Sequence, residues 1–335
     1  MSASVLSMQG KIRIMKLMLL FSVLLMGLKF FAWWITHSNA ILTDALESIV
    51  NVVAGTFALF SIIYASRPRD EDHPYGHGKI EFVSAGFEGA LVLIAGCAII
   101  YESIIGFIHP HPIDQTDIGA YLSAASGFIN FLMGRYLVRR GKRENSMLME
   151  ANGRHLMSDT LSSAGLVLGL LIIYFTKLYW IDNALAIGFG LYIFYTGYKI
   201  VRESLANLLD EQDIEKVHQL VRILNANRRP NWIDMHNLRI LKYGSGLHVD
   251  AHITLPWYLS LEESHHEVDN VENLVKKELG EDIEFFIHAD PCLVSSCPIC
   301  PVKNCPHRKF PQEKSLEWTV QNMLPDQKHH IQTKV

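Results

Sequence analysis

The chain has 335 residues, of which 49% are hydrophobic and only 19% are charged, and its net charge is −4. This composition is too apolar for an ordinary soluble protein, and the apolar residues are concentrated in the first two thirds of the chain. The basic residues stand in short clusters beside apolar runs rather than in one patch, which argues against nucleic-acid binding. We therefore expect a membrane protein with a soluble C-terminal part.

Several apolar segments are long enough to cross a lipid bilayer as helices. Six of them are predicted, at residues 14–36, 40–65, 84–108, 117–138, 148–175 and 180–201. The first exceeds the apolar part of a signal peptide and lacks a small-residue cleavage site, so we expect no cleaved segment. These helices form a predicted transmembrane domain, 14–207, after a short N-terminal segment, 1–13.

The charges of the connecting loops predict the orientation in the membrane. Lysine and arginine cluster before the first apolar segment and after the second, fourth and sixth, whereas the other three loops together hold one lysine. Positively charged loops stay in the cytosol. We expect a multi-pass integral membrane protein with both termini cytosolic, in the cell (inner) membrane if the source is bacterial.

Two of the apolar segments carry polar side chains that need a functional reason. A carboxylate at the middle of a membrane helix costs roughly 2.5 to 3.5 kcal/mol. Glu47 and Asn51 lie four residues apart on one face of the second segment, with Asp44 one turn earlier, and His155 and Asp159 are spaced in the same way on the fifth. The orientation makes these two helices antiparallel. Together they could supply four oxygen or nitrogen ligands, which outlines a metal site.

The loop after the second segment holds four further potential ligands. Asp70, Asp72, His73 and His77 lie within a short, turn-rich stretch. They indicate a second metal site, although a solvated loop remains an alternative.

The composition becomes that of a soluble domain after Leu209, with helix and strand patterns in the order αββαβ. In the second predicted strand, His248 and His252 point away from the apolar face. A single histidine on that face would be an ordinary surface residue, but several more potential ligands follow in the sequence. The predicted regulatory metal site comprises His248, His252, His265, His288 and Asp290 in a cytosolic domain spanning 208–291.

The remaining stretch, 292–335, is predicted to be a cysteine-rich and then disordered tail. It offers the potential ligands Cys292, Cys297, Cys300, Cys305 and His307. Four thiolates suit zinc or another soft metal, and free thiols in a disordered tail are the alternative. Cys97 stands alone in an apolar run, where we expect a small buried residue.

Several motifs together resemble the cation diffusion facilitator family of divalent metal transporters. They are SNAILTDALESIVN in the second segment, DEDHPYGHGKIE in the following loop, HLMSD in the fifth segment, and HVDAHITL and IHADP in the soluble domain. The resemblance covers nearly everything from the first helix to Cys292.

This resemblance implies a homodimeric, six-helix exporter that exchanges cytosolic zinc or a similar ion for protons, with a copper-chaperone-like αββαβ domain. It assigns Glu47, Asn51, His155 and Asp159 to the transport site, Asp70, His73 and His77 to the loop site, and His252, His265, His288 and Asp290 to the cytosolic site. It also pairs Lys79 with Asp210 as a charge pair that joins the subunits.

We therefore expect proton-coupled efflux of divalent metal ions by alternating access, with the metal as substrate and regulator, and no enzymatic activity. Where zinc transporters usually place Asp or His in the second helix, this chain has Glu47 and Asn51. Zinc remains the first choice, and iron(II), manganese and cobalt stay open because they suit oxygen-richer sites. The alternative function is a membrane-bound sensor that binds metal without transporting it.

Overall fold

The structure is a computed structural model that describes residues 8–36, 39–108, 117–176, 180–280 and 283–329. The chain forms two compact units, Met1–Leu209 (unit 1) and Asp210–Val335 (unit 2), and each is described here by itself.

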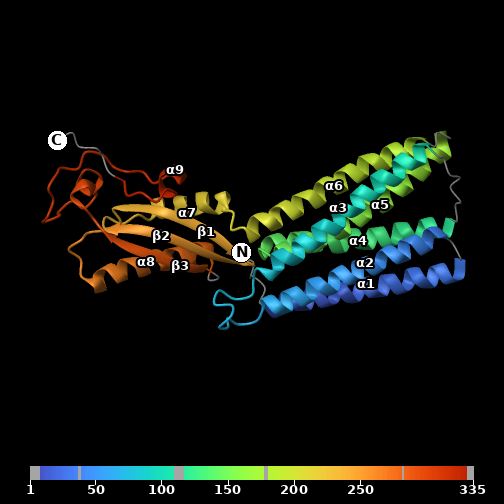
Figure 1. Cartoon of the computed structure of the whole chain (residues 1–335), viewed down its shortest axis with the longest axis horizontal. Coiled ribbons are helices and arrows are strands. Elements are labelled where there is room, and N and C mark those ends of the chain that lie inside the picture. Colours follow the sequence, from blue (N-terminus) through green and yellow to red (C-terminus); the bar gives the residue numbers. More distant parts are fainter. Residues whose placement is uncertain (1–7, 37–38, 109–116, 177–179, 281–282, 330–335) are drawn as a thin grey trace. The chain divides into compact units, whose positions relative to one another are not determined.

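The regular secondary structure in the described part of unit 1 is helical, and a loop joins its second and third helices (Figure 1). Its helices are α1 (Met8–Thr36), α2 (Asn39–Ala65), α3 (Ile80–Ile108), α4 (Asp117–Arg143), α5 (Met147–Thr176) and α6 (Trp180–Leu208). Each has 27 to 30 residues. At 1.5 Å per residue they are about 40 to 45 Å long, which exceeds the hydrocarbon thickness of about 30 Å in a bilayer.

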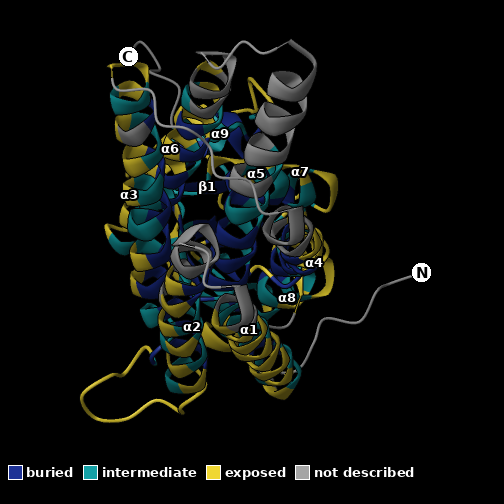
Figure 2. Ribbon diagram, turned by 90° about the vertical axis from the view of Figure 1, so that its right-hand side faces the viewer, coloured by how far each residue is buried: buried dark blue, intermediate teal, exposed yellow. Residues whose placement is uncertain are grey.

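In the described residues, α1 to α4 and α6 expose large apolar side chains. Large side chains such as Leu24, Val53, Ile94 and Tyr195 are exposed, and Figure 2 shows exposed residues along α1, α2 and α3 with buried ones between the helices. Within the described residues, Gln9–Phe31 and Ile80–Ile108 are long and apolar enough to cross a membrane by length and composition. Such surfaces are unfavourable in water and favourable in lipid.

Cys97 lies on this exposed surface of α3. The expectation of a buried thiol was therefore wrong. A run that is apolar on every side gives no periodicity from which its inward face can be recognised.

Close packing of α3 against α6 depends on glycine. A Cβ added at Gly197 would lie 2.5 Å from the backbone nitrogen of Leu93, and one added at Gly96 would lie 2.6 Å from that of Phe194. Small residues let membrane helices approach at backbone distance. This packing fixes the position of α3, which carries a buried glutamate of the site described below.

Unit 2 is a small mixed sheet with helices. Its elements are α7 (Ile214–Ala226), β1 (Asp234–Tyr243), β2 (Gly246–Leu255), α8 (Leu261–Leu279), β3 (Ile283–Pro291), the 3-10 helix η1 (Val294–Ile299) and α9 (Val320–Met323). The strand order is β1-β2-β3, with β1 antiparallel and β3 parallel to β2. The parallel pair requires a crossover, which α8 provides. The first five elements follow the predicted order αββαβ.

The core of unit 2 follows from its sequence periodicity. On α7, Val217, Leu220, Val221 and Leu224 are buried on one face, as their spacing of three and four residues dictates. They pack against the apolar face of the sheet, to which β2 contributes alternate residues ending at Leu255. The other face of β2 is left for its histidines.

The stretch after β3 differs from the disordered tail that the sequence predicted. Trp318 and Met323 belong to the core of unit 2, with exposed fractions of 1% and 0%. The main chain also bonds across the unit, since Asn237 N donates to Pro325 O over 2.9 Å. A few isolated apolar anchors order this segment, and they are too sparse to give a periodic pattern. Residues 330–335 lie outside the described part of the chain.

Candidate metal centres

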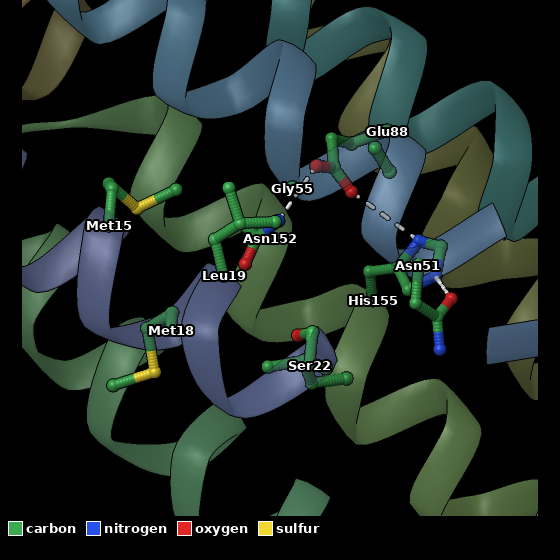
Figure 3. Close-up of a pocket in the computed structure, with 11 residues that line it drawn as sticks. Met15, Met18, Leu19, Ser22, Asn51, Gly55, Glu88, Asn152 and His155 are labelled. Atoms are coloured by element: carbon green, nitrogen blue, oxygen red, sulfur yellow. Dashed lines mark hydrogen bonds and ion pairs between the residues drawn. The ribbon is translucent and has the colours of Figure 1, made fainter. Parts of the chain in front are cut away.

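In unit 1, α2, α3 and α5 bring together a polar network among apolar side chains (Figure 3). The ring Nε2 of His155 lies 2.8 Å from Asn51 Oδ1, and Asn51 Nδ2 donates to Asp159 Oδ2 over 2.7 Å. A carboxylate oxygen only accepts, so Asn51 presents its amide NH₂ to Asp159 and its carbonyl to the imidazole. Three of the four predicted transport ligands therefore meet at one point.

The side chains of Asp44 and Glu47 lie outside the described residues. Both belong to the first half of α2, and the structure therefore does not place these two predicted ligands.

Glu88 of α3 is the member of this network that sequence reasoning missed. Its carboxylate is fully buried, with Oε2 3.4 Å from His155 Nδ1 and Oε1 accepting from Asn152 Nδ2 over 2.8 Å. His155 Nε2 already faces the side-chain carbonyl of Asn51. A proton shared between His155 Nδ1 and the Glu88 carboxylate would give the second ring nitrogen a hydrogen-bond partner as well. The available signal was a carboxylate, at Glu88, in a mostly apolar run that also holds Glu102.

The space at this site is small. A cavity of about 10 Å³ is lined by Met15, Asn51, Gly55, Glu88 and His155 together with their neighbours. That volume is close to the minimum for one water molecule, about 10 to 15 Å³. A hydrated ion does not fit, so an ion that enters must exchange its water for protein ligands or the helices must separate.

The loop between α2 and α3 holds a second cluster. Asp70, His73 and His77 each offer a ligand atom within 4.8 Å of the others. The Asp70 carboxylate lies 2.9 Å from His73 Nδ1 and 3.3 Å from His77 Nε2. Partial desolvation raises the pKa of Asp70, but the hydrogen bonds from His73 outweigh it and leave that pKa lowered. The Asp70 carboxylate therefore stays ionised and available to a cation. Asp72, the fourth predicted ligand of this loop, is not part of the cluster.

Unit 2 holds a third cluster, made of His236, His252 and Asp290. Asp290 Oδ2 lies 3.5 Å from His236 Nε2 and 3.5 Å from His252 Nδ1. Burial lowers the pKa of His236, against the opposing effect of nearby carboxylates. The neutral imidazole is the form that binds a metal. His288 lies beside this cluster, with its ring centre 4.9 Å from that of His252.

Sequence reasoning missed His236, which lies near the start of β1 (Asp234–Tyr243), beside an irregularity in that strand. Asn237 has a positive φ of 53°, and the pairing of β1 with β2 shifts between His236 and Arg239. This bulge leaves His236 directly opposite His252. Sequence periodicity alone does not reveal such a bulge.

Two predicted ligands lie elsewhere in unit 2. His248 is on the same strand as His252 but four residues away, about 13 Å at 3.3 Å per residue, and it contacts Asp250 and Glu284. His265 is on the solvent side of α8, with its side chain 74% exposed and 3.9 Å from Asp269. The structure therefore does not bring either histidine to the cluster.

The end of the described chain covers the third cluster. Lys328 Nζ lies 3.2 Å from Asp290 Oδ1, and His329 Nδ1 lies 2.6 Å from Asp234 Oδ1. The hydrogen bond to Asp234 raises the pKa of His329. The Lys328 ammonium group thus already contacts Asp290, which is the carboxylate that the third cluster offers to a metal.

The remaining predicted residues are placed as follows. Cys292, Cys297, Cys300, Cys305 and His307 line one cavity in unit 2. Lys79 precedes α3 and Asp210 follows α6. Their proposed pairing concerns a second copy of the chain and stays a prediction.

A bundle of long apolar helices with a buried polar network, followed by a mixed-sheet unit with clustered histidine and carboxylate side chains, is typical of a class of two-part membrane proteins that handle cations. Residues 15–209 match the family model of the cation efflux transmembrane domain, and residues 209–292 match that of the cation efflux protein cytoplasmic domain. The chain belongs to the cation efflux family, which confirms the resemblance to cation diffusion facilitators. This is a family of membrane transporters, not of enzymes.

Individual relatives agree with this assignment. The chain is 31% identical over 254 residues to the uncharacterized transporter sll1263 of Synechocystis sp., covering 76% of this chain and 82% of the relative. It is 27% identical over 270 residues to the cation-efflux pump FieF of Shewanella oneidensis, covering 81% and 90%. It is 29% identical over 280 residues to the pump of the same name from Yersinia pestis, covering 81% and 89%.

Proposed function

We propose that this protein exports a divalent metal ion, with zinc as the first candidate, from the cytosol in exchange for protons. The observation that carries the proposal is the network of Asn51, Glu88, His155 and Asp159, which joins three helices around a buried carboxylate. Burying this charge is costly, and a passive membrane anchor would not need it. The family membership supports cation efflux itself.

The proposed cycle follows from the charges of the site. Carboxylates and a neutral imidazole bind a dication only after they lose their protons, so metal and protons compete. In the inward-facing state, ligands from α2 and α5 bind the metal, with Glu47 as the fourth proposed ligand. In the outward-facing state protonation of His155 expels the metal, because imidazole titrates near physiological pH. Alternating access links the two states.

The arrangement that we propose is a homodimer with six membrane-spanning helices in each chain and both termini in the cytosol. The exposed apolar side chains of α1 to α4 and of α6 support membrane contact, and the loop charges support the orientation. The third cluster then lies in the cytosol, where its occupancy would favour one arrangement of the two cytosolic units. Metal would act there as a regulator.

Reconstituted protein tests the proposal. Liposomes that contain a pH-sensitive dye are given Zn²⁺, Fe²⁺, Mn²⁺ and Co²⁺ in turn, with and without an imposed pH gradient. We expect metal uptake that moves protons in the opposite direction, and its loss in Asp159→Ala, because Asp159 bonds directly to Asn51. A sensor would bind metal without flux. Flux that ignores the pH gradient would contradict proton exchange.

A further inference from the structure

The stretch that follows β3 gathers four thiols around one cavity. Cys292, Cys297, Cys300 and Cys305 are free cysteines and line a cavity of about 390 Å³. They come from the end of unit 2's last strand, from η1 and from the turns after it. The match to the family's cytoplasmic domain ends at residue 292, so the three later cysteines lie beyond it.

The main chain around the central pair of cysteines is fixed by one side chain. Arg308 donates hydrogen bonds to the carbonyls of Cys297 over 3.0 Å, Cys300 over 3.2 Å and Val302 over 2.5 Å. The thiol of Cys292 is also held in place, because the backbone nitrogen of Trp257 donates a hydrogen bond to its Sγ over 3.4 Å. The backbone of the loop is therefore organised before any ligand binds.

The chemistry of the cavity selects a soft cation. Cys297 and Cys300 have two residues between them, which is the usual spacing of paired zinc ligands. Among the described residues, those that line the cavity include no carboxylate, whereas they include the cations Arg308 and Lys309. A dication bound to four thiolates carries a net charge of −2. These two basic side chains would offset that charge.

We propose that Cys292, Cys297, Cys300 and Cys305 form a tetrathiolate zinc site that fastens the segment after β3 to the rest of unit 2. Zn–S bonds of about 2.3 Å in a tetrahedron place the sulfurs about 3.8 Å apart. No three of these sulfurs lie within 4.8 Å of one another in the described residues. Binding therefore requires the cysteine side chains to rotate inward on the backbone that Arg308 holds. A closed site of four protein ligands is structural rather than transporting.

Titration of the thiols in the purified full-length protein tests this site. A mercurial reagent is added stepwise and released zinc is read with a metal-sensitive dye, since histidine and carboxylate sites do not release metal to a mercurial. We expect about one zinc ion per chain to be released as the thiols react. The variant Cys97→Ser, which changes a cysteine on α3, should release the same amount. The double variant Cys297→Ser/Cys300→Ser should release none.

Cobalt gives a second readout. Full-length protein loaded with Co²⁺ should show sulfur-to-cobalt charge-transfer absorption, which should persist in Cys97→Ser and disappear in the double variant. Absence of this band and of thiol-dependent zinc release in the wild type would overturn the proposal, as would equal zinc release from the double variant. Neither measurement involves flux, so the site stands or falls independently of the transport function.

Discussion

Among the described residues, Glu88 is the carboxylate that lies nearest to His155 of the proposed transport site, with its Oε2 3.4 Å from His155 Nδ1. Glu88→Gln keeps the size of the side chain and an acceptor for Asn152, while it removes the charge. We expect metal flux to become less dependent on an imposed pH gradient, because the partner that competes for the histidine proton is lost. Proton-coupled uptake into liposomes measures this.

The control for this prediction is Glu203→Gln, which changes a carboxylate that is 41% exposed on α6 and pairs with Lys199. It should leave the pH dependence of uptake unchanged. Unaltered coupling in Glu88→Gln would show that this carboxylate is only a structural partner of Asn152.

The ammonium group of Lys328 lies 3.2 Å from Asp290, so we expect it to compete with a metal ion at the third cluster. Lys328→Ala should therefore strengthen zinc binding there severalfold, on the order of 1 kcal/mol for a partly exposed ion pair. The measurement is the zinc concentration that gives half of the zinc-dependent rise in the unfolding temperature of unit 2. Lys314→Ala, at an exposed lysine of the same segment, is the control, and an equal effect of both changes would contradict competition at Asp290.

At the level of single residues, the sequence indicated which polar side chains lie together where they repeat with helical spacing. His155 and Asp159 could be found because helix geometry keeps residues four apart on one face. Asp70 and His73 could be found because they lie close together in one short loop. Glu88 and His236 could not, because they reach their sites through helix packing and through a strand bulge. Both are long-range effects that local periodicity does not contain.

At the level of elements, the contact between α3 and α6 leaves no room for added volume at its glycines. Gly197→Ala places a methyl carbon 2.5 Å from backbone atoms of α3, which must shift. We expect a net loss of about 1 to 3 kcal/mol of stability, despite the gain that replacing glycine brings to a helix. Gly188→Ala lies on the same helix with nothing within 4 Å of the added carbon.

Gly188→Ala is the control for this prediction. It should be neutral or slightly stabilising, opposite in sign to Gly197→Ala. Thermal unfolding in detergent compares the two variants, and flux should fall in Gly197→Ala because α3 carries Glu88. Equal unfolding temperatures would show that the two helices can separate without cost.

The segment that ends at His329 should be held more firmly at low pH. The hydrogen bond with Asp234 raises the pKa of His329. A raised pKa in the folded state stabilises fully below the unfolded value, about 6.5, and this stabilisation is lost as pH rises through the folded value. Limited proteolysis should cleave near Lys328 more slowly at pH 6 than at pH 8.5. His329→Gln should remove most of that difference.

At the level of elements, the helices and strands could be predicted and the segment after β3 could not. The spacing of Val217, Leu220, Val221 and Leu224 determines α7 by itself. In contrast, Trp318 is ordered by the core that the rest of unit 2 forms around it. The sequence shows which residues can be buried, but sparse anchors acquire their partners only in the folded unit.

For the molecule as a whole, the two compact units should respond separately to destabilising changes. Trp318 is 1% exposed and stacks against the guanidinium of Arg228, whose carbon lies 4.0 Å from the ring centre. Trp318→Ala should destabilise unit 2 by about 3 to 5 kcal/mol. Calorimetry of the full chain should show a lower transition for unit 2 and an unchanged one for unit 1. Leu261→Ala, at a residue that is 88% exposed, is the control.

The position of Trp318 also affects the order of events during synthesis. The ribosome releases α7, the three strands and α8 well before it releases this tryptophan, so the nascent domain lacks a central part of its interior until late in translation. Helices α1 to α6 emerge far earlier and can enter the membrane before then. A ribosome that stalls just before Trp318 would therefore leave an inserted bundle attached to an incompletely folded domain, which proteases that recognise unfolded chains could remove.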